Sequence, residues 1–338
     1  RSRRSALPFA SMGKVFVTRQ IPDEGLKKLK AAGHSVTVYR GDRAIPRKEL
    51  IAGVKGVDAL LSLLTDKIDG EIMDAGGKKL KIIANYAVGF DNVDLPAAKT
   101  RGIPVTNTPA PEVSETVAEH AFALMISLAH RIPEADRFAR AGKYKGWGPQ
   151  MLLGVDLYGK TIGIVGLGRI GRAVCERAVK GFRMKVVYSD LKKDAAFEKE
   201  YGARYLPLEK LLQEADFVSL HVPLFPSTRH LISTAEFALM KKTAYIVNTS
   251  RGPIIDELAL ERALRTGRIA GAGLDVFECE PLIDCDPGDT LELRKMENVV
   301  LTPHTASATI EARQAMSRLA ADNIIAVLKG KPPLTPAK

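Results

Sequence analysis

Three side chains in the second half of the chain have the chemistry to reduce a carbonyl group together: Arg251, Glu280 and His304. A guanidinium can hold a carboxylate at two points, and an imidazolium can deliver a proton to a carbonyl oxygen. A neighbouring carboxylate keeps that imidazolium protonated. Each residue also has an ordinary structural role as its alternative, but the three types together suit hydride transfer to a 2-oxo acid.

Hydride chemistry needs a cofactor, and the sequence TIGIVGLGRIG, which starts at Thr161, has the pattern of a dinucleotide site. A short apolar run leads into a G-x-G-x-x-G turn that opens a helix. Gly166 permits the tight turn, Gly168 lets the backbone approach the pyrophosphate, and Gly171 lets the helix pack against the strand. A turn that serves only this packing is the alternative reading of the motif alone.

The choice of cofactor depends on Asp190, which ends the next apolar run, KVVYS, nineteen residues after Gly171. At about this separation a carboxylate meets the ribose hydroxyl groups of bound NAD. The same carboxylate would repel the 2′-phosphate of NADP by on the order of 4 kcal/mol per unit charge at about 4 Å. We therefore expect NAD, with Lys192 and Lys193 as residues that soften the preference.

The elements that must position these residues alternate in type along the chain. Short β-rich runs alternate with helical patterns over residues 14–107, and a second series of the same kind runs over residues 161–304. Strands separated by helices of this length predict parallel, doubly wound sheets, so we expect an α/β fold with two Rossmann-like domains. Apolar periodicity predicts long helices near residues 112–131 and 309–328.

The second long helix has no sheet of its own, and we expect it to pack on the N-terminal domain. One domain is then inserted into the other: a flavodoxin-like substrate domain takes residues 12–107 and 303–333, and an NAD-binding domain takes residues 108–302. The cleft between the domains is the expected place for cofactor and substrate. Residues 1–11 contain three arginines and are interpreted as a tag or a disordered segment, with a transit-peptide remnant as the alternative.

Composition narrows the class of protein. The chain has 338 residues, 46% of them hydrophobic and 26% charged, and no apolar run reaches the roughly 18 residues of a membrane span. The formal net charge is +11, or +8 without the three arginines of residues 1–11. The remaining basic residues are spread along helices rather than gathered in one stripe, so we expect neither a nucleic-acid nor a membrane partner. Cys175, Cys279 and Cys285 lack metal-ligand spacing, and their odd number favours a reducing cytoplasm over a disulfide framework, so no metal is expected.

Four motifs in order, GLGRIG, NTSRG, GLDVFECEP and TPH, resemble those of the D-isomer-specific 2-hydroxyacid dehydrogenase family, and the match runs over residues 14–333. The segments IANYAVGFDNVD and DLYGKTIGIVGLGRIG are similar to those of its glyoxylate and hydroxypyruvate reductase branch. The resemblance implies reversible, NAD(H)-dependent reduction of a small 2-oxo acid to the D-2-hydroxy acid. It implies that Arg251 holds the substrate, His304 is the general acid/base and Glu280 orients His304.

The resemblance also implies further contacts. For the cofactor they are Gly166, Gly168, Arg169, Ile170, Gly171, Asp190, His221, Pro223, Thr249 and Asp275. For the substrate they are the backbone N–H groups of Val88 and Gly89, the side chain of Arg251, and Leu64. Trp147 lies in an irregular stretch, residues 142–154, that in resembling enzymes crosses a homodimer interface and reaches the partner's substrate pocket; plain interface packing is its alternative.

Other readings of the same resemblance remain open. A D-3-phosphoglycerate or D-lactate-type dehydrogenase would use the same residues on a different acid. A dinucleotide-sensing, corepressor-like binding protein belongs to a different class and would show no turnover. Within the family a formate dehydrogenase is disfavoured, because that branch has Gln where this chain has Glu280.

Overall fold

The structure, a computed structural model, describes residues 12–280 and 292–337. The interpretation of residues 1–11 and the position of Cys285 lie outside the described residues. The chain divides into two compact units, and the second, Ser114–Ala308, interrupts the first in the sequence. The expected domain boundaries, 107/108 and 302/303, lie six residues before the corresponding boundaries of these units.

The first unit is built on a five-stranded sheet in which every neighbouring pair is parallel. Its strands, in spatial order, are β2 (Ser35–Val38), β1 (Lys14–Val17), β3 (Ala59–Leu63), β4 (Ile82–Tyr86) and β5 (Val105–Thr106). Its helices are α1 (Asp23–Ala31), α2 (Arg47–Val54), α3 (Gly70–Gly76), α4 (Leu95–Thr100) and α12 (Ile310–Leu328). The parallel α/β arrangement predicted from the sequence is confirmed for this unit.

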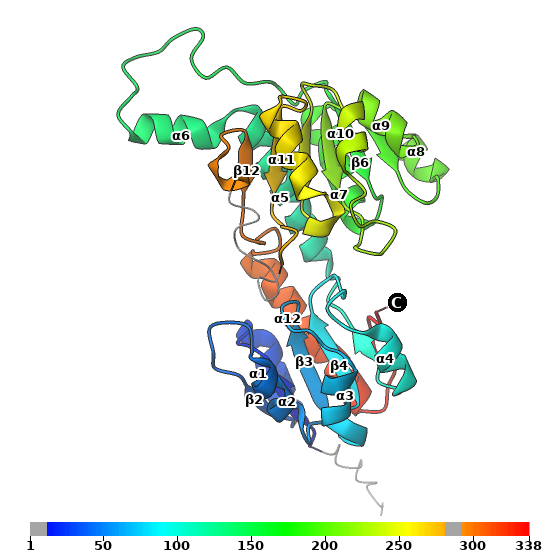
Figure 1. Ribbon diagram of the computed structural model, residues 1–338. Coiled ribbons are helices and arrows are strands. Elements are labelled where there is room, and N and C mark those ends of the chain that lie inside the picture. The colour runs from blue at the N-terminus through cyan, green and yellow to red at the C-terminus, as the bar shows by residue number, and fades with distance from the viewer. Residues whose placement is uncertain (1–11, 281–291, 338) are drawn as a thin grey trace, which may run out of the picture. The chain divides into compact units, whose positions relative to one another are not determined.

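The C-terminal helix α12 returns to the first unit and packs against α1 and β4, as predicted (Figure 1). The approach to α1 is close, since a Cβ atom on Gly25 would lie 2.1 Å from the carbonyl oxygen of Ser317. The Ser317 hydroxyl accepts a hydrogen bond from the Gly25 N–H at 3.0 Å and donates one to the Pro22 carbonyl at 2.6 Å. These contacts hold the C-terminal helix α12 against α1.

The second unit is built on a seven-stranded sheet, also parallel throughout. Its strands, in spatial order, are β12 (Val299–Leu301), β11 (Gly271–Leu274), β10 (Tyr245–Asn248), β9 (Phe217–Leu220), β6 (Thr161–Val165), β7 (Lys185–Ser189) and β8 (Arg204–Tyr205). From β6 the sheet grows to one side through β7 and to the other through β9. Ligands of doubly wound folds bind at the carboxyl ends of the strands where the order reverses in this way.

Helices cover both faces of this second sheet, because alternate residues of its strands face opposite sides. Ile162 and Ile164 of β6 join a core with α5 (Pro111–Ala129) and α7 (Arg169–Phe182). Val165 joins the opposite core with residues of α9 (Leu208–Glu214), α10 (Thr234–Leu239) and α11 (Glu257–Arg265). The remaining helix of the core region is α8 (Ala195–Tyr201), whose Phe197 packs edge-on against Tyr188. The doubly wound fold class is thereby confirmed.

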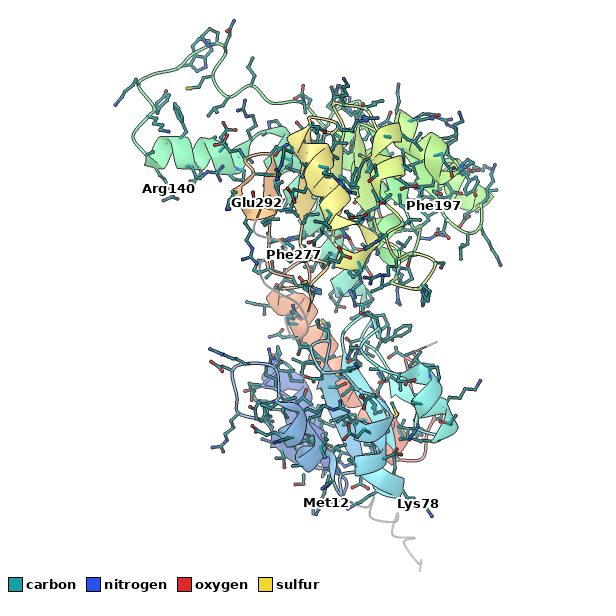
Figure 2. All side chains as sticks on the ribbon, viewed as in Figure 1. Met12, Lys78, Arg140, Phe197, Phe277 and Glu292 are labelled. Carbon is teal, nitrogen blue, oxygen red and sulfur yellow. The ribbon has the colours of Figure 1, made fainter. Side chains whose placement is uncertain are left out.

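Some elements were not predicted. The helix expected over residues 112–131 ends at Ala129, and Arg131, at a φ of 53°, starts a second helix, α6 (Ile132–Arg140). No residue of α6 is buried within the chain, although the helix is strongly amphipathic, so a helical pattern was present in the sequence and was overlooked. Figures 1 and 2 show α6 projecting from the second unit, with Arg140 at its far end and a long loop after it. The strand β8 and the helix α9 were also missed. β8 has only two residues, whereas Leu208, Leu211 and Leu212 of α9 do repeat at helical spacing.

Within residues 12–280 and 292–337, no helix combines the length and the apolar character that crossing a bilayer demands.

Candidate functional site

The glycine turn after β6 has the geometry expected of a pyrophosphate cradle. Gly166 has a φ of +95°, and a Cβ atom there would lie 2.8 Å from the backbone of His221. A Cβ atom on Gly171 would lie 2.1 Å from the Gly166 carbonyl oxygen, so helix and turn touch directly. Gly168, the N-cap of α7, has no other atom within 4 Å of its would-be Cβ and no side-chain cap. The space that the protein leaves there lies over the first turn of α7, where backbone N–H groups attract an anion.

Asp190 stands beside this turn at the carboxyl end of β7. One of its carboxylate oxygens accepts from the Leu167 N–H at 2.6 Å and the other from the Leu191 N–H at 2.6 Å. These two bonds fix the carboxylate in place. A cavity of about 330 Å³ opens next to it, lined by Leu167, Arg172, Asp190, Lys192, Lys193, Asp194 and Ala195.

Two of the three basic residues that line this cavity, Arg172 and Lys193, have acidic partners. Arg172 lies 2.6 Å from Asp194, and Lys193 lies 3.1 Å from Glu198. Their positive charge is therefore partly neutralised by the protein itself. The carboxylate of Asp190, by contrast, accepts from backbone N–H groups, which carry no net charge.

Two further predicted cofactor residues carry buried polar atoms that lack a partner within the described residues: Nδ1 of His221 and Oγ1 of Thr249. The His221 ring is enclosed, although part of the residue is exposed, and its Nε2 lies 2.8 Å from the Ser219 hydroxyl. Burial lowers the pKa of His221 to about 3, so the ring is neutral. Buried polar atoms usually have partners, so these two atoms fit a site that receives a polar ligand.

The predicted residues Arg169 and Ile170 form the first turn of α7, and Pro223 lies in the exposed loop after β9. The open space at Gly168, the fixed carboxylate of Asp190 and the polar atoms of His221 and Thr249 all follow adjacent strands, β6, β7, β9 and β10. A dinucleotide is a group that these features fit.

The proposed acid/base pair is formed in the structure. Nδ1 of His304 lies 2.7 Å from Oε2 of Glu280, and the side chains are 25% and 21% exposed. When Nδ1 carries a proton it donates to the carboxylate, which leaves Nε2 to exchange a proton with a ligand. His304 has a φ of 53°, an uncommon conformation for a residue other than glycine. Its backbone N–H donates to the Asp275 carbonyl at 2.8 Å, which helps to hold this conformation.

Asp275 is fully buried and organises the loop that carries His304. Its carboxylate accepts from the Thr302 hydroxyl at 2.5 Å and from the N–H groups of Thr305 and Ala306 at 2.8 Å each. Burial alone would raise the pKa of Asp275, but hydrogen bonds from His120, Thr302 and the loop N–H groups outweigh it and lower the pKa. The Asp275 side chain is 0% exposed, and its expected contact with nicotinamide stays a prediction.

His120 is a residue of this network that sequence reasoning missed. It lies on α5, and its Nε2 is 2.9 Å from the Thr302 hydroxyl and 3.4 Å from the Asp275 carboxylate. Its partners are more than 150 positions away in the sequence, so no local motif could indicate its role. Only the packing of α5 under the sheet brings it to the loop.

Arg251 follows β10 and precedes a short 3₁₀ turn, η2 (Gly252–Ile254). Its carbonyl accepts from the Asn248 side chain at 2.8 Å, and its guanidinium donates to the Ser250 carbonyl at 2.8 Å. The loops carrying Arg251, Glu280 and His304 follow β10, β11 and β12, which are neighbours in one parallel sheet. All three side chains therefore belong to the same edge of the second unit.

The predicted substrate residues of the first unit also share one edge, since Leu64 follows β3 and the turn with Val88 and Gly89 follows β4. The Asn107 side chain donates to the Val88 carbonyl at 2.6 Å, and the Asn85 side chain donates to the Gly89 carbonyl at 3.1 Å. These two bonds fix the peptide groups of the turn. Trp147, in the loop after α6, is 81% exposed.

Comparison with known proteins gives consistent matches. The family model for the NAD binding domain of D-isomer specific 2-hydroxyacid dehydrogenases matches residues 122–306. A glyoxylate reductase of Korarchaeum cryptofilum is 52% identical over 321 residues, which are 95% of this chain and 94% of that protein. The crystal structure of a Thermus thermophilus protein is 43% identical, with a TM-score of 0.88, and covers 96% of this chain and 100% of that one.

A third match carries ligands. It is the structure of an NADPH-dependent glyoxylate/hydroxypyruvate reductase from Sinorhizobium meliloti in complex with NADP and malonate. It is 33% identical, with a TM-score of 0.82, over 97% of each chain.

Proposed function

Because the chain belongs to the D-isomer-specific 2-hydroxyacid dehydrogenase family, we propose that this oxidoreductase reduces a small 2-oxo acid of the glyoxylate or hydroxypyruvate type to the D-2-hydroxy acid. The reaction is reversible and uses NAD(H). The observation that carries the proposal is the 2.7 Å pair of His304 and Glu280, on loops that follow neighbouring strands of the sheet that also presents Arg251.

Each of these residues has a distinct task. The planar guanidinium of Arg251 binds the substrate carboxylate with two parallel donors. His304 gives the proton on Nε2 to the carbonyl oxygen as negative charge develops there, and takes it back in the oxidation direction. Glu280 stabilises the imidazolium and holds the ring by Nδ1. When bound, the dinucleotide supplies or accepts the hydride.

The remaining cofactor and substrate contacts are assigned to loops at the carboxyl ends of the strands in each sheet. We assign the turn from Gly166 to Gly171 to the pyrophosphate, and His221, Pro223 and Thr249 to other parts of the cofactor. The backbone N–H groups of Val88 and Gly89 are assigned to the substrate carboxylate, and Leu64 to the pocket wall.

We propose NAD rather than NADP as the cofactor, because the carboxylate of Asp190 is fixed by two backbone N–H groups. A 2′-phosphate beside it would be repelled, while Arg172 and Lys193 are engaged with Asp194 and Glu198. A similar reductase, from S. meliloti, is described as NADPH-dependent, so the cofactor of this chain has to be measured directly. A larger kcat/KM for NADH than for NADPH is expected, and a preference for NADPH would overturn the assignment.

We also propose a cytoplasmic homodimer. Six of the twelve large apolar side chains exposed among the described residues fall between Ile132 and Tyr158, in α6 and the loop after it. Such a concentration is typical of a protein–protein contact. The buried Cys175 forms no disulfide, which suits a reducing compartment. Light scattering on the purified protein should give the mass of two chains, and the mass of one chain would contradict the dimer.

The experiment that tests the function is a panel of 2-oxo acids with NADH: glyoxylate, hydroxypyruvate, pyruvate and a bulkier acid, with chiral analysis of the product. Fastest turnover of glyoxylate or hydroxypyruvate supports the proposal. A clear preference for pyruvate or for 3-phosphohydroxypyruvate would move the assignment to a D-lactate or D-3-phosphoglycerate dehydrogenase. Tight binding of dinucleotide without turnover of any acid would indicate a binding protein.

A further inference from the structure

Three residues outside the proposed catalytic set, His230, Glu257 and Glu278, form a hydrogen-bonded group that we call the brace. Nε2 of His230 lies 2.5 Å from one carboxylate oxygen of Glu278. The backbone N–H of Glu278 donates to the Glu257 carboxylate at 2.5 Å, and the Glu257 N–H faces the other oxygen of Glu278 at 3.4 Å. Glu257 is only 7% exposed.

The brace adjoins Glu280 in the sequence, because Glu278 lies two residues before Glu280 in the loop after β11. Both the backbone and the side chain of Glu278 are held, so the path of the chain into Glu280 is fixed. Glu280 is in turn the partner of His304.

The brace also reaches the loop of Arg251. The backbone N–H of His230 donates to the Pro253 carbonyl at 2.7 Å, and His230 adopts a φ of 51° to do so. A Cβ atom on Gly252 would lie 1.7 Å from the carbonyl oxygen of Phe277, a residue labelled in Figure 2. The two loops are therefore in direct backbone contact, and His230 is bonded to both of them.

We propose that His230 and Glu278 are positioning residues for the reaction: through them the brace sets the place of the Glu280 carboxylate against His304 and of the loop that presents Arg251. His230 lies in the same loop, between β9 and α10, as the proposed cofactor residues His221 and Pro223. It therefore also connects these residues to the loops that carry Arg251 and Glu280. This inference rests on the proposed function for the roles of Arg251, Glu280 and His304.

The proposal makes a specific prediction about pH. If Glu280 moves away from Nδ1, the imidazolium of His304 loses its stabilising charge, and reduction, which needs that imidazolium, fails at a lower pH. The charged groups facing His304 are Glu280 and, through its loop, Asp275 with His120. Those facing the brace are Arg229, 3.5 Å from Glu278, and Asp256. Burial alone would raise the pKa of Asp256, but hydrogen bonds from Ala259 and Ser233, with a smaller contribution from His230, lower it.

The test uses His230→Ala and Glu278→Ala, with His230→Gln as the conservative variant that keeps a side-chain donor. The rate of 2-oxo acid reduction is measured against pH, and the ring signals of His304, assigned with His304→Gln, are followed by NMR over the same range. We expect the alanine variants to lose about 10-fold or more in kcat with a small change in the KM for NADH, and the alkaline limb to move to lower pH. Glutamine at position 230 should restore part of both effects.

Asp216→Asn serves as the matched control. Asp216 accepts from the Thr161 N–H and from Lys241, at the amino ends of the strands, so its loss weakens the fold without touching the catalytic loops. Any effect of Asp216→Asn on the rate should be the same factor at every pH, so the alkaline limb of the rate–pH profile should stay at its wild-type position.

The proposal would be overturned if the alanine variants kept the wild-type position of the alkaline limb in the rate–pH profile and the wild-type midpoint of the His304 titration. A double variant with the summed effects of His230→Ala and Glu278→Ala would do the same, since partners in one brace should be non-additive. If the alanine variants do not fold, the same comparison is made with His230→Gln and Glu278→Gln. Absence of turnover in the unaltered protein would defeat the proposed function alone, because the NMR titration reads the brace without turnover.

Discussion

Nδ1 of His304 lies 2.7 Å from a carboxylate oxygen of Glu280, and neither side chain is more than 25% exposed. Because both side chains are largely buried, the carboxylate can hold the ring by Nδ1 while Nε2 is left for a ligand. The histidine is held at this carboxylate by a backbone conformation with φ of 53° and by the buried Asp275 below its loop.

Glu280→Gln tests the charge in this pair. The amide keeps the size and one acceptor but loses the negative charge, so the imidazolium is less stable. We expect kcat for reduction to fall by about 10- to 100-fold and the alkaline limb of its pH profile to move to lower pH. Steady-state rates across pH measure both. Glu292→Gln, at a carboxylate paired with Lys295 in the same unit, is the control, and equal profiles for the two variants would refute the role of Glu280.

Arg251→Lys tests the grip on the substrate carboxylate. An ammonium keeps the charge but cannot provide two parallel donors from one plane, so kcat/KM for the 2-oxo acid should fall by about 100-fold or more. The affinity for NADH, measured by calorimetry, should change little. Arg262→Lys on the exposed side of α11 is the matched control. Wild-type kcat/KM in Arg251→Lys would remove this residue from the site.

Asp190→Asn tests the choice between the two dinucleotides. The amide oxygen can still accept one of the two backbone N–H bonds, while the repulsion of a 2′-phosphate disappears. The ratio of kcat/KM for NADH to that for NADPH should drop by about 100-fold, which corresponds to about 3 kcal/mol. Asp136→Asn, in an exposed pair with Arg140, should leave the ratio unchanged. An unchanged ratio in Asp190→Asn would show that specificity lies elsewhere.

Gly168→Ala and Gly171→Ala separate ligand approach from packing. At Gly168 the fold has room for a methyl group and a φ of −72°, so stability should stay within about 0.5 kcal/mol while NADH binding weakens. At Gly171 the methyl group would meet the Gly166 carbonyl at 2.1 Å, so the free energy of unfolding should fall by more than about 2 kcal/mol. Urea unfolding and calorimetry measure the two effects. Undiminished NADH affinity in Gly168→Ala would argue against pyrophosphate at this turn.

His221 makes the stability depend on pH. Burial lowers its pKa to about 3 from 6.5, so below pH 6.5 the unfolded chain binds a proton there and the folded chain does not. This contribution is present above pH 6.5 and is lost as the pH falls towards 3. It should cost about 1.4 kcal/mol of unfolding free energy per pH unit between about pH 5.5 and 3.5.

His221→Gln should remove this part of the slope when unfolding free energies are measured by urea titration across that range. The exposed His130→Gln is the control. Equal slopes for wild type and His221→Gln would mean that the ring is not excluded from water in the folded protein.

The sequence was sufficient for the fold class and for the strands that precede the candidate residues, because regular alternation and strand-end motifs are local signals. Arg251, Glu280 and His304 each lie in the loop after such a run, so their common edge followed from the parallel order of the sheet. The partners behind them were not predictable. His120 and His230 acquire their roles from residues distant in sequence, and the burial of Asp275 depends on the loop that folds over its carboxylate.

The central claim is that His304 delivers a proton while a small 2-oxo acid accepts hydride. Its most direct test is the rate of NADH oxidation with glyoxylate for the wild-type protein and for His304→Gln, with the NADH affinity of both measured. We predict turnover by the wild type and a loss of about 100- to 10,000-fold in the variant at similar NADH affinity. A variant as fast as the wild type would contradict the claim.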